Sequence, residues 1–227
     1  MATFDSLAPT YDADFTHSKI GSHLRNRIHS HLLELWQSEQ HILELGCGTG
    51  EDAYFLGSHG IHVTATDVSP NMLKITQEKT SSLSNVTVQQ LDLSHLPSDD
   101  FTTQYDGVLS NFGALNCIDG WQPLAQWLSK RVKSGGTLAF AVMAPYCVWE
   151  TLWHGLHFDF KTATRRWGAS ARFTPDEDTS LNITYPSVKH MTQDFAPYFE
   201  RTRIQPLGLL LPPSDVYPVI EKHPSLL

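Results

Sequence analysis

Several features that would place this 227-residue chain in a secreted, membrane-spanning or metal-binding class are absent from its sequence. No apolar run is as long as a membrane-spanning helix requires. The N-terminus has neither a basic segment nor an apolar core, so we expect no signal peptide. The three cysteines, Cys47, Cys117 and Cys147, are widely spaced and odd in number, which argues against a disulfide framework and against a metal site. These absences favour a cytoplasmic location.

Basic residues are also few. The chain has 16 lysines and arginines against 24 aspartates and glutamates, and its net charge is −8. Nonspecific binding to nucleic acid or to anionic membranes needs a basic surface. We therefore expect neither nucleic acid nor a membrane as a partner. The sequence has no internal repeat, and its length suits a single domain with one substantial core.

Short apolar runs alternate with amphipathic patterns along the first 143 residues. Ser22 and Ser69 are expected to cap helices, the second of which has Pro70 in its first turn. A regular succession of strands and helices predicts a parallel α/β sheet with right-handed crossovers. The predicted strands are 41–45, 61–67, 86–92, 105–112 and 137–143, and the predicted helices are 22–37, 51–59, 69–82 and 121–133.

The alternation stops at Pro145. Residues 145–185 are rich in tryptophan, tyrosine and phenylalanine, and we expect them to form a lid over the edge of the sheet where ligands bind. A helix over 186–199 and a closing strand pair over 201–213 are expected to follow, with Pro206 limiting the pair to an edge or a bulge.

Three glycines lie within five positions of the stretch HILELGCGTGEDA, between a predicted strand and a predicted helix. Such a turn lies at the carboxyl edge of a parallel sheet and lets a ligand approach the main chain. The spacing is not the dinucleotide fingerprint, because the third glycine follows the second by two residues, and no P-loop lysine follows. The next two residues, Glu51 and Asp52, would repel a pyrophosphate. We therefore expect a cationic or zwitterionic nucleoside that bears a sulfonium.

Polar residues end the neighbouring predicted strands. Asp67 comes twenty-one residues after Gly46, the distance at which an acid binds ribose hydroxyls in nucleotide-binding folds. Asp92 ends the third strand, where its carboxylate can accept a hydrogen bond from the amine of adenine. Asn111 follows the fourth strand. Because the ends of parallel strands meet at one edge, one adenosine-bearing ligand could span these residues.

Five segments in this order resemble the class I S-adenosylmethionine-dependent methyltransferases: LELGCGTG, ATDVSPNML, QLDL, YDGVLSNFGALN and VKSGGTLAF. The resemblance covers roughly residues 4–143. It implies a Rossmann-like α/β fold, in which a seven-stranded, mostly parallel sheet with an antiparallel last strand has helices on both faces. It also implies S-adenosyl-L-methionine as the cofactor and methyl transfer as the activity.

We expect four parts within this single domain. They are an N-terminal cap and helix (1–40), a cofactor-binding α/β core (41–144), a lid and acceptor insertion (145–185), and a C-terminal helix with closing strands (186–227).

The resemblance also assigns roles on the methionine side of the cofactor. The glycine loop would back the methionine portion, and Glu44, where the family often has an aspartate, would reach the amino group. Asn111 and Phe112 would border the methionyl side. Tyr11 would belong to an N-terminal element that closes over the cofactor in many members.

On the nucleoside side, Asp67 would bind the ribose and Met72 would pack near the adenine. Asp92 and the backbone amide of Leu93 would hold the adenine amino group. The full set expected to bind the cofactor is Tyr11, Glu44, Gly46, Cys47, Gly48, Gly50, Asp67, Val68, Met72, Asp92, Leu93, Asn111 and Phe112.

The acceptor is expected to be a small apolar or aromatic molecule, because the segment PYCVWETLWHGLHFDF is rich in aromatic residues. His154 and His157 are three residues apart and could share a helical face, so either is a candidate general base. No NPPY signature of amino-group methylation follows the fourth strand, which favours O- or C-methylation; we predict methylation at oxygen by in-line displacement. The alternatives are methylation of a carrier-bound acyl chain or a tRNA base, and a non-catalytic module that binds the cofactor.

Overall fold

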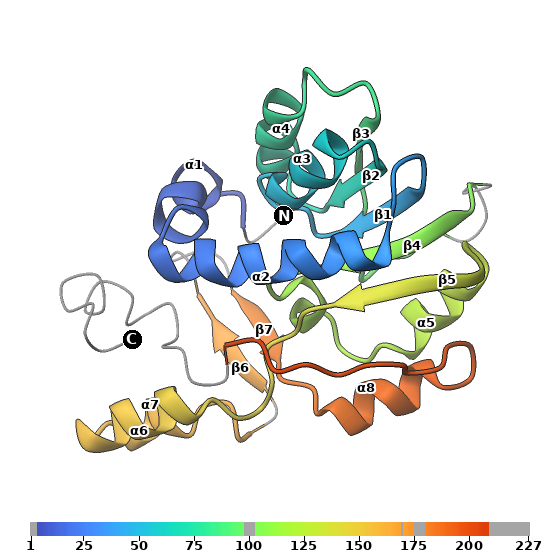
Figure 1. Cartoon of the computed structure of the whole chain (residues 1–227). Helices are drawn as coiled ribbons and strands as arrows, with labels where there is room; N and C mark the ends of the chain where they lie inside the picture. Colours follow the sequence, from blue (N-terminus) through green and yellow to red (C-terminus); the bar gives the residue numbers. More distant parts are fainter. Residues whose placement is uncertain (1–3, 98–102, 169, 175–179, 209–227) are drawn as a thin grey trace.

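A sheet of five parallel strands forms the centre of the molecule (Figure 1). The computed structural model describes residues 4–97, 103–168, 170–174 and 180–208. The strands lie in the order β3-β2-β1-β4-β5, and each neighbouring pair is parallel. The strands are β1 (His41–Leu45), β2 (His62–Asp67), β3 (Val86–Gln90), β4 (Tyr105–Ser110) and β5 (Val132–Phe140).

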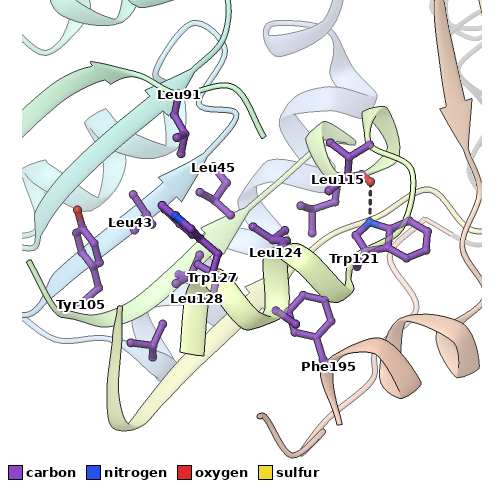
Figure 2. Packing of buried hydrophobic residues seen from close by; sticks show 14 residues of the cluster. Leu43, Leu45, Leu91, Tyr105, Leu115, Trp121, Leu124, Trp127, Leu128 and Phe195 are labelled. Atoms are coloured by element: carbon purple, nitrogen blue, oxygen red, sulfur yellow. Dashed lines mark hydrogen bonds between the residues drawn. The ribbon is translucent and has the colours of Figure 1, made fainter. Parts of the chain in front are cut away.

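Helices cover both faces of this sheet (Figure 1). On one face lie α2 (Lys19–Leu35), α3 (Glu51–Ser58) and α4 (Pro70–Lys79), and on the other lie α5 (Gln122–Ser129) and α8 (Val188–Phe195). The alternation of side chains along β1 separates two cores, because Leu43 and Leu45 pack against α5 whereas Ile42 packs against α2 and α3. Figure 2 shows the first core, where the Trp121 indole Nε1 donates to the carbonyl of Leu115 at 2.9 Å.

The helix starts follow local capping chemistry. The hydroxyl of Ser69 accepts a hydrogen bond from the Met72 amide at 3.2 Å, and α4 begins at Pro70, as predicted. The cap of α2 is Ser18, whose hydroxyl accepts from the Gly21 amide at 3.0 Å. The prediction of Ser22 as that cap is wrong, because Ser22 lies one turn further along and donates to the carbonyl of Thr16.

Two short helices precede α2. They are α1 (Ala8–Tyr11) and the π-helical turn η1 (Asp12–Thr16). A further short 3-10 helix, η2 (Ala114–Cys117), follows β4.

After β5 the chain leaves the sheet. A helix pair, α6 (Val148–Leu156) and α7 (Phe160–Ala163), is joined by a hydrogen bond from the Thr151 hydroxyl to the carbonyl of Ala163 at 3.3 Å. The antiparallel hairpin of β6 (Ser170–Phe173) and β7 (Leu181–Thr184) follows. It is anchored to η2, because the Asn116 amide donates to the carbonyl of Thr184 at 2.6 Å.

The expectation of seven strands is wrong for the described residues, whose main sheet has five. Residues 201–208 form no strand, and residues 209–213 of the predicted closing pair lie outside the described residues. Pro206 has no amide hydrogen to give to a strand ladder, and Leu207 packs instead against the core between α2 and β1. The two additional strands, β6 and β7, pair only with each other.

Candidate functional site

The glycine loop follows β1 at the point where the strand order reverses, since β2 lies on one side of β1 and β4 on the other. Ligands bind in the crevice at such a switch point. The amides of Gly46 and Cys47 both donate to the carbonyl of Thr66, each at 2.8 Å. Gly46 has a φ of 72°, and a Cβ there would lie 2.2 Å from the Cβ of Ala114. These hydrogen bonds fix the start of the loop against the end of β2, and the close approach of Ala114 allows only glycine at its first position.

Gly48 faces open space, because a Cβ built on it would meet no atom within 4 Å among the described residues. Its amide donates to Asp67 Oδ2 at 2.9 Å, and the Ser69 amide donates to Asp67 Oδ1 at 2.9 Å. The structure thus joins the glycine loop to the acid at the end of β2. Burial raises the pKa of Asp67. Each carboxylate oxygen keeps a further acceptor position for a ligand hydroxyl.

Glu44 lies buried in β1, two residues before the loop, with 2% of its surface exposed. Among the described residues, its Oε2 atom has no hydrogen-bond partner. Burial raises the pKa of Glu44 well above its usual value, and the negative charges of Asp52 and Asp67 raise it further. A buried polar atom without a partner is costly, and such atoms point to a ligand or a functional role.

A buried charge network lies beside Glu44. The Asp52 carboxylate accepts hydrogen bonds from Arg25 Nη1 at 2.7 Å and from Asn111 Nδ2 at 2.8 Å, and His29 Nε2 lies 2.7 Å from the same carboxylate. Burial alone would raise the pKa of Asp52, but these partners outweigh it and lower the pKa to about 2. Asn111 therefore belongs to this network through Asp52, and its predicted place beside the cofactor stays a prediction.

Arg25 and His29 were not predicted as site residues. Their spacing of four residues places them on one face of α2, next to the buried stripe of Ile28 and Leu32. Polar residues on an otherwise apolar helix face were the signal that could have found them. The argument that Glu51 and Asp52 would repel an anionic ligand needs correction, because Asp52 is neutralised by Arg25.

Aromatic residues border the network. The guanidinium of Arg25 lies over the Phe112 ring at 4.5 Å, and Phe15 meets Phe112 edge-on at 4.9 Å between centroids. Tyr11 packs against Phe15 at 5.6 Å. Burial raises the pKa of Tyr11 to about 12, and Asp52 and Asp67 both contribute to the shift. Tyr11 and Phe112 therefore lie close to the same group of charged and polar residues as Glu44, Asn111 and Asp67.

The N-terminal segment is tied across the glycine loop. The hydroxyl of Thr49 donates to Asp12 Oδ1 at 2.6 Å. Lys79 Nζ donates to Asp12 Oδ2 and to Glu51 Oε2, both at 2.9 Å. Asp5 caps the start of α4 through the Ser69 hydroxyl. We call the set Asp12, Thr49, Lys79 and Glu51 the N-terminal clasp.

Two residues predicted to bind the adenine, Asp92 and Leu93, make contacts with neighbouring residues of the protein. Asp92 Oδ1 accepts from the Ser94 amide at 2.8 Å, and Oδ2 lies 2.9 Å from His95 Nδ1. Burial opposes ionisation of Asp92, but these hydrogen bonds outweigh it and lower its pKa. The Leu93 side chain packs into the core beside α5.

Other predicted residues flank the loop. Met72 is buried on α4, and Val68 follows β2 with 36% of its surface exposed. Cys47 is buried, with Sγ 3.7 Å from the Thr76 hydroxyl, and burial raises its pKa well above the usual value. A Cβ at Gly50 would lie 2.6 Å from Thr76 Cγ2, so this position also requires glycine.

The two candidate bases lie on α6 and at its end, apart from the strand ends in Figure 1. His157 is exposed, and its Nδ1 lies 2.7 Å from the Trp153 carbonyl of the same helix. His154 Nδ1 lies 3.8 Å from Asp159 Oδ2. Their catalytic role stays a prediction.

Comparison with known proteins supports the resemblance to methyltransferases that the sequence predicts. Residues 43–138 match the family model described as a methyltransferase domain. The demethylmenaquinone methyltransferase of Clavibacter sepedonicus is 28% identical over 137 residues, and the match covers 60% of this chain and 55% of that protein. Its counterpart in Listeria welshimeri is 31% identical over 142 residues, covering 60% of this chain and 58% of that protein. The chain thus spans little more than half the length of these curated relatives.

Among solved structures, the complex of DhpI with S-adenosylhomocysteine superposes with a TM-score of 0.59 at 21% identity, covering 86% of this chain and 83% of that chain. The shared architecture and the glycine loop at the switch point define a Rossmann-like α/β domain whose ligand edge lies beside β1. The match of residues 43–138 to a methyltransferase-domain model supports the predicted resemblance to the S-adenosylmethionine-dependent methyltransferases.

Proposed function

We propose that this chain transfers the methyl group of S-adenosyl-L-methionine to a small organic acceptor. The observation that carries the proposal is the buried carboxylate of Glu44, whose Oε2 has no partner among the described residues and which lies two residues before Gly46 of the glycine loop. A cationic amino group is the ligand that such a carboxylate accommodates best, and the cofactor has one.

The residues present fit the cofactor. Glu44 would hold its ammonium group, and Arg25, whose buried Nε has no partner among the described residues, would hold its carboxylate. Asp67 would accept the ribose hydroxyls, and Met72 and Val68 would flank the adenine. Asp92 and the Leu93 amide remain our proposal for the adenine amino group.

When bound, the cofactor supplies a methyl group activated by a sulfonium. The chain's own residues would align the acceptor with it and exclude water, and alignment alone can supply roughly 7–11 kcal/mol. The N-terminal clasp would hold Tyr11 and Phe15 over the site. A general base adds a factor of about 10²–10⁴ where the acceptor has a proton to lose. His154 and His157 are our candidates for that base.

For the acceptor we propose an apolar or aromatic small molecule, methylated at oxygen. The aromatic insertion 145–185 would serve as its lid, and the cytoplasm would be its compartment. The curated relatives are named for methylation of demethylmenaquinone, which supports a ring-bearing, apolar acceptor for this chain.

Two measurements test the proposal. Isothermal titration calorimetry with S-adenosylmethionine and with S-adenosylhomocysteine is expected to give binding of both. Release of S-adenosylhomocysteine is then assayed against phenols, quinols, amines, carboxylic acids and lipids, and turnover is expected with apolar ring compounds. Absence of cofactor binding would refute the proposed function. Binding without turnover on every acceptor would leave a non-catalytic module as the correct description.

A further inference from the structure

Three acids at the ligand edge lie close to one arginine. Of the charges that act on Glu44, those of Asp52 and Asp67 are negative and that of Arg25 is positive. The guanidinium of Arg25 is bound to Asp52, with Nη1 2.7 Å from Oδ1. Lys79 is bound to the acids of the N-terminal clasp. The three acids would therefore carry an excess of negative charge if all of them were ionised.

Hydrogen-bond donors are divided unequally among these acids. Asp52 accepts hydrogen bonds from two side chains, at 2.7 and 2.8 Å. Asp67 accepts from two backbone amides, both at 2.9 Å. The Oε2 atom of Glu44 has no partner among the described residues, although only 2% of this residue is exposed. A buried carboxylate with few donors is the least stable as an anion, so Glu44 is the acid that takes up a proton first.

Other ionisable groups beside Glu44 keep their charge near neutral pH. Burial raises the pKa of Tyr11 to about 12 and that of Cys47 well above its usual value, so both stay protonated. The pKa of Asp52, about 2, keeps this carboxylate ionised. His29 Nε2 lies 2.7 Å from Asp52 Oδ1, so its hydrogen bond stabilises that carboxylate rather than Glu44. Among these groups, Glu44 is the one whose protonation a ligand can change.

An ammonium group is the ligand that stabilises the ionised form of Glu44. It brings one positive charge and three N–H donors to the carboxylate. The cofactor of the proposed function has such a group on its methionine portion. Because the ammonium already holds its three protons, the proton of the carboxylic acid must leave. The O–H bond of Glu44 breaks, the electron pair stays on the carboxylate, and the proton passes to the solvent.

We propose that Glu44 is a protonated carboxylic acid in the ligand-free chain and releases its proton to the solvent when the ammonium group of the cofactor binds. The proposal rests on the proposed function, because it takes the amino group of S-adenosylmethionine as the partner of Glu44. It makes Glu44 a specificity-determining residue. A ligand with a cationic amine gains affinity as the pH rises, by up to about tenfold per pH unit while Glu44 is mostly protonated, and a ligand without an amine does not.

Calorimetry with S-adenosylhomocysteine in buffers of different ionisation enthalpy measures the number of protons released on binding. Between about pH 5 and about pH 7 an ordinary glutamate is mostly ionised and an α-amino group mostly protonated, and here the wild type is expected to release about half a proton or more. Glu44→Gln is expected to release none. Glu78→Gln, at an exposed position of α4, is the matched control and should behave like the wild type. The desamino analogue of S-adenosylhomocysteine, which keeps the carboxylate, is expected to bind the wild type without proton release.

Infrared difference spectroscopy of the ligand-free proteins gives a second measurement, which does not require the variant to bind. The difference between the wild type and Glu44→Gln is expected to contain the carbonyl band of a protonated carboxylic acid. Addition of S-adenosylhomocysteine is expected to remove this band from the wild type.

The outcomes separate this proposal from the proposed function. Binding of S-adenosylhomocysteine with release of less than about half a proton at every pH in this range overturns the proposal and leaves the proposed function intact. A release that persists in Glu44→Gln assigns the proton to another group, such as Asp67 or His29, and also overturns it. So does the absence of the carbonyl band from the ligand-free wild type. Absence of any binding refutes the proposed function and this proposal with it.

Discussion

Arg25 on α2 and Asp52 on α3 form a buried ion pair in which Nη1 and Oδ1 are 2.7 Å apart and the side chains are 9% and 4% exposed. The pair ties the N-terminal helix to the helix that follows the glycine loop. His29 and Asn111 share the same carboxylate. The methionine side of the proposed cofactor site is therefore built around a carboxylate that the cofactor itself would not need to contact.

Removing the charge of Asp52 is expected to destabilise the fold. Asp52→Asn leaves the guanidinium of Arg25 buried without a counter-charge, for which a loss of about 3–5 kcal/mol is typical. Urea unfolding followed by circular dichroism measures the free energy of unfolding. Asp14→Asn, at an exposed position of η1, is the matched control and is expected to change it by less than about 0.5 kcal/mol. Equal stability of the two variants would contradict the network.

Acid is expected to remove the same stabilisation. The pKa of Asp52 is lowered to about 2 from its usual value of 3.8, so the unfolded chain binds a proton there more readily than the folded one. The contribution is fully present above about pH 4 and is lost as the pH falls toward about 2. Between these pH values, the free energy of unfolding should fall more steeply with decreasing pH for the wild type than for Asp52→Asn. Parallel curves would contradict this.

Glu44 is expected to change the pH dependence of stability in the direction opposite to that of Asp52. Its pKa is raised in the folded chain, so the folded state holds the proton more tightly and stability falls as the pH rises above about 4.5. Glu44→Gln should therefore be more stable than the wild type at pH 8. It should also bind S-adenosylmethionine about tenfold or more weakly, because the ammonium loses an ionised partner. Thermal melts and calorimetry test both effects, and Glu78→Gln on the surface of α4 is the control.

Asp67 is expected to contribute equally to binding of the cofactor and of its demethylated product, since both carry the ribose. Asp67→Asn should weaken both by about tenfold or more, because the amide accepts fewer hydrogen bonds than the carboxylate. Asp106→Asn, at the opposite end of the sheet, should leave both affinities unchanged. A loss confined to one of the two ligands would contradict the assignment to the ribose.

The N-terminal clasp is expected to control cofactor release. Lys79→Met removes its ion pairs with Asp12 and Glu51, and partly exposed pairs of this kind are worth about 0–1 kcal/mol each. The dissociation rate of S-adenosylhomocysteine, measured by stopped-flow fluorescence, should rise by up to about fivefold for each ion pair that is lost. High salt should accelerate the wild type similarly. Lys74→Met, exposed on the same helix, should change nothing.

Local sequence signals predicted the elements of the α/β core well. Strand β1 occupies the predicted residues, and α4 starts at the predicted proline after the predicted serine cap. These features depend on short-range chemistry: alternation of apolar residues, side-chain capping and the fixed φ of proline. The predicted strand over the described residues 201–208 does not form, because strand pairing depends on distant parts of the chain and Leu207 packs against the core instead.

By itself the sequence determined the parallel core, the glycine loop and the acids at its neighbouring strand ends, because strand length, turn chemistry and residue order are local properties of the chain. Only the tertiary structure decided how charges separated along the chain meet. It buries Glu44 with no partner for Oε2 among the described residues, brings Arg25, His29 and Asn111 to Asp52, and turns the apolar face of α6 outward. Burial and pairing depend on which distant elements pack together, and these contacts set the pKa values and the ligand that the site can hold.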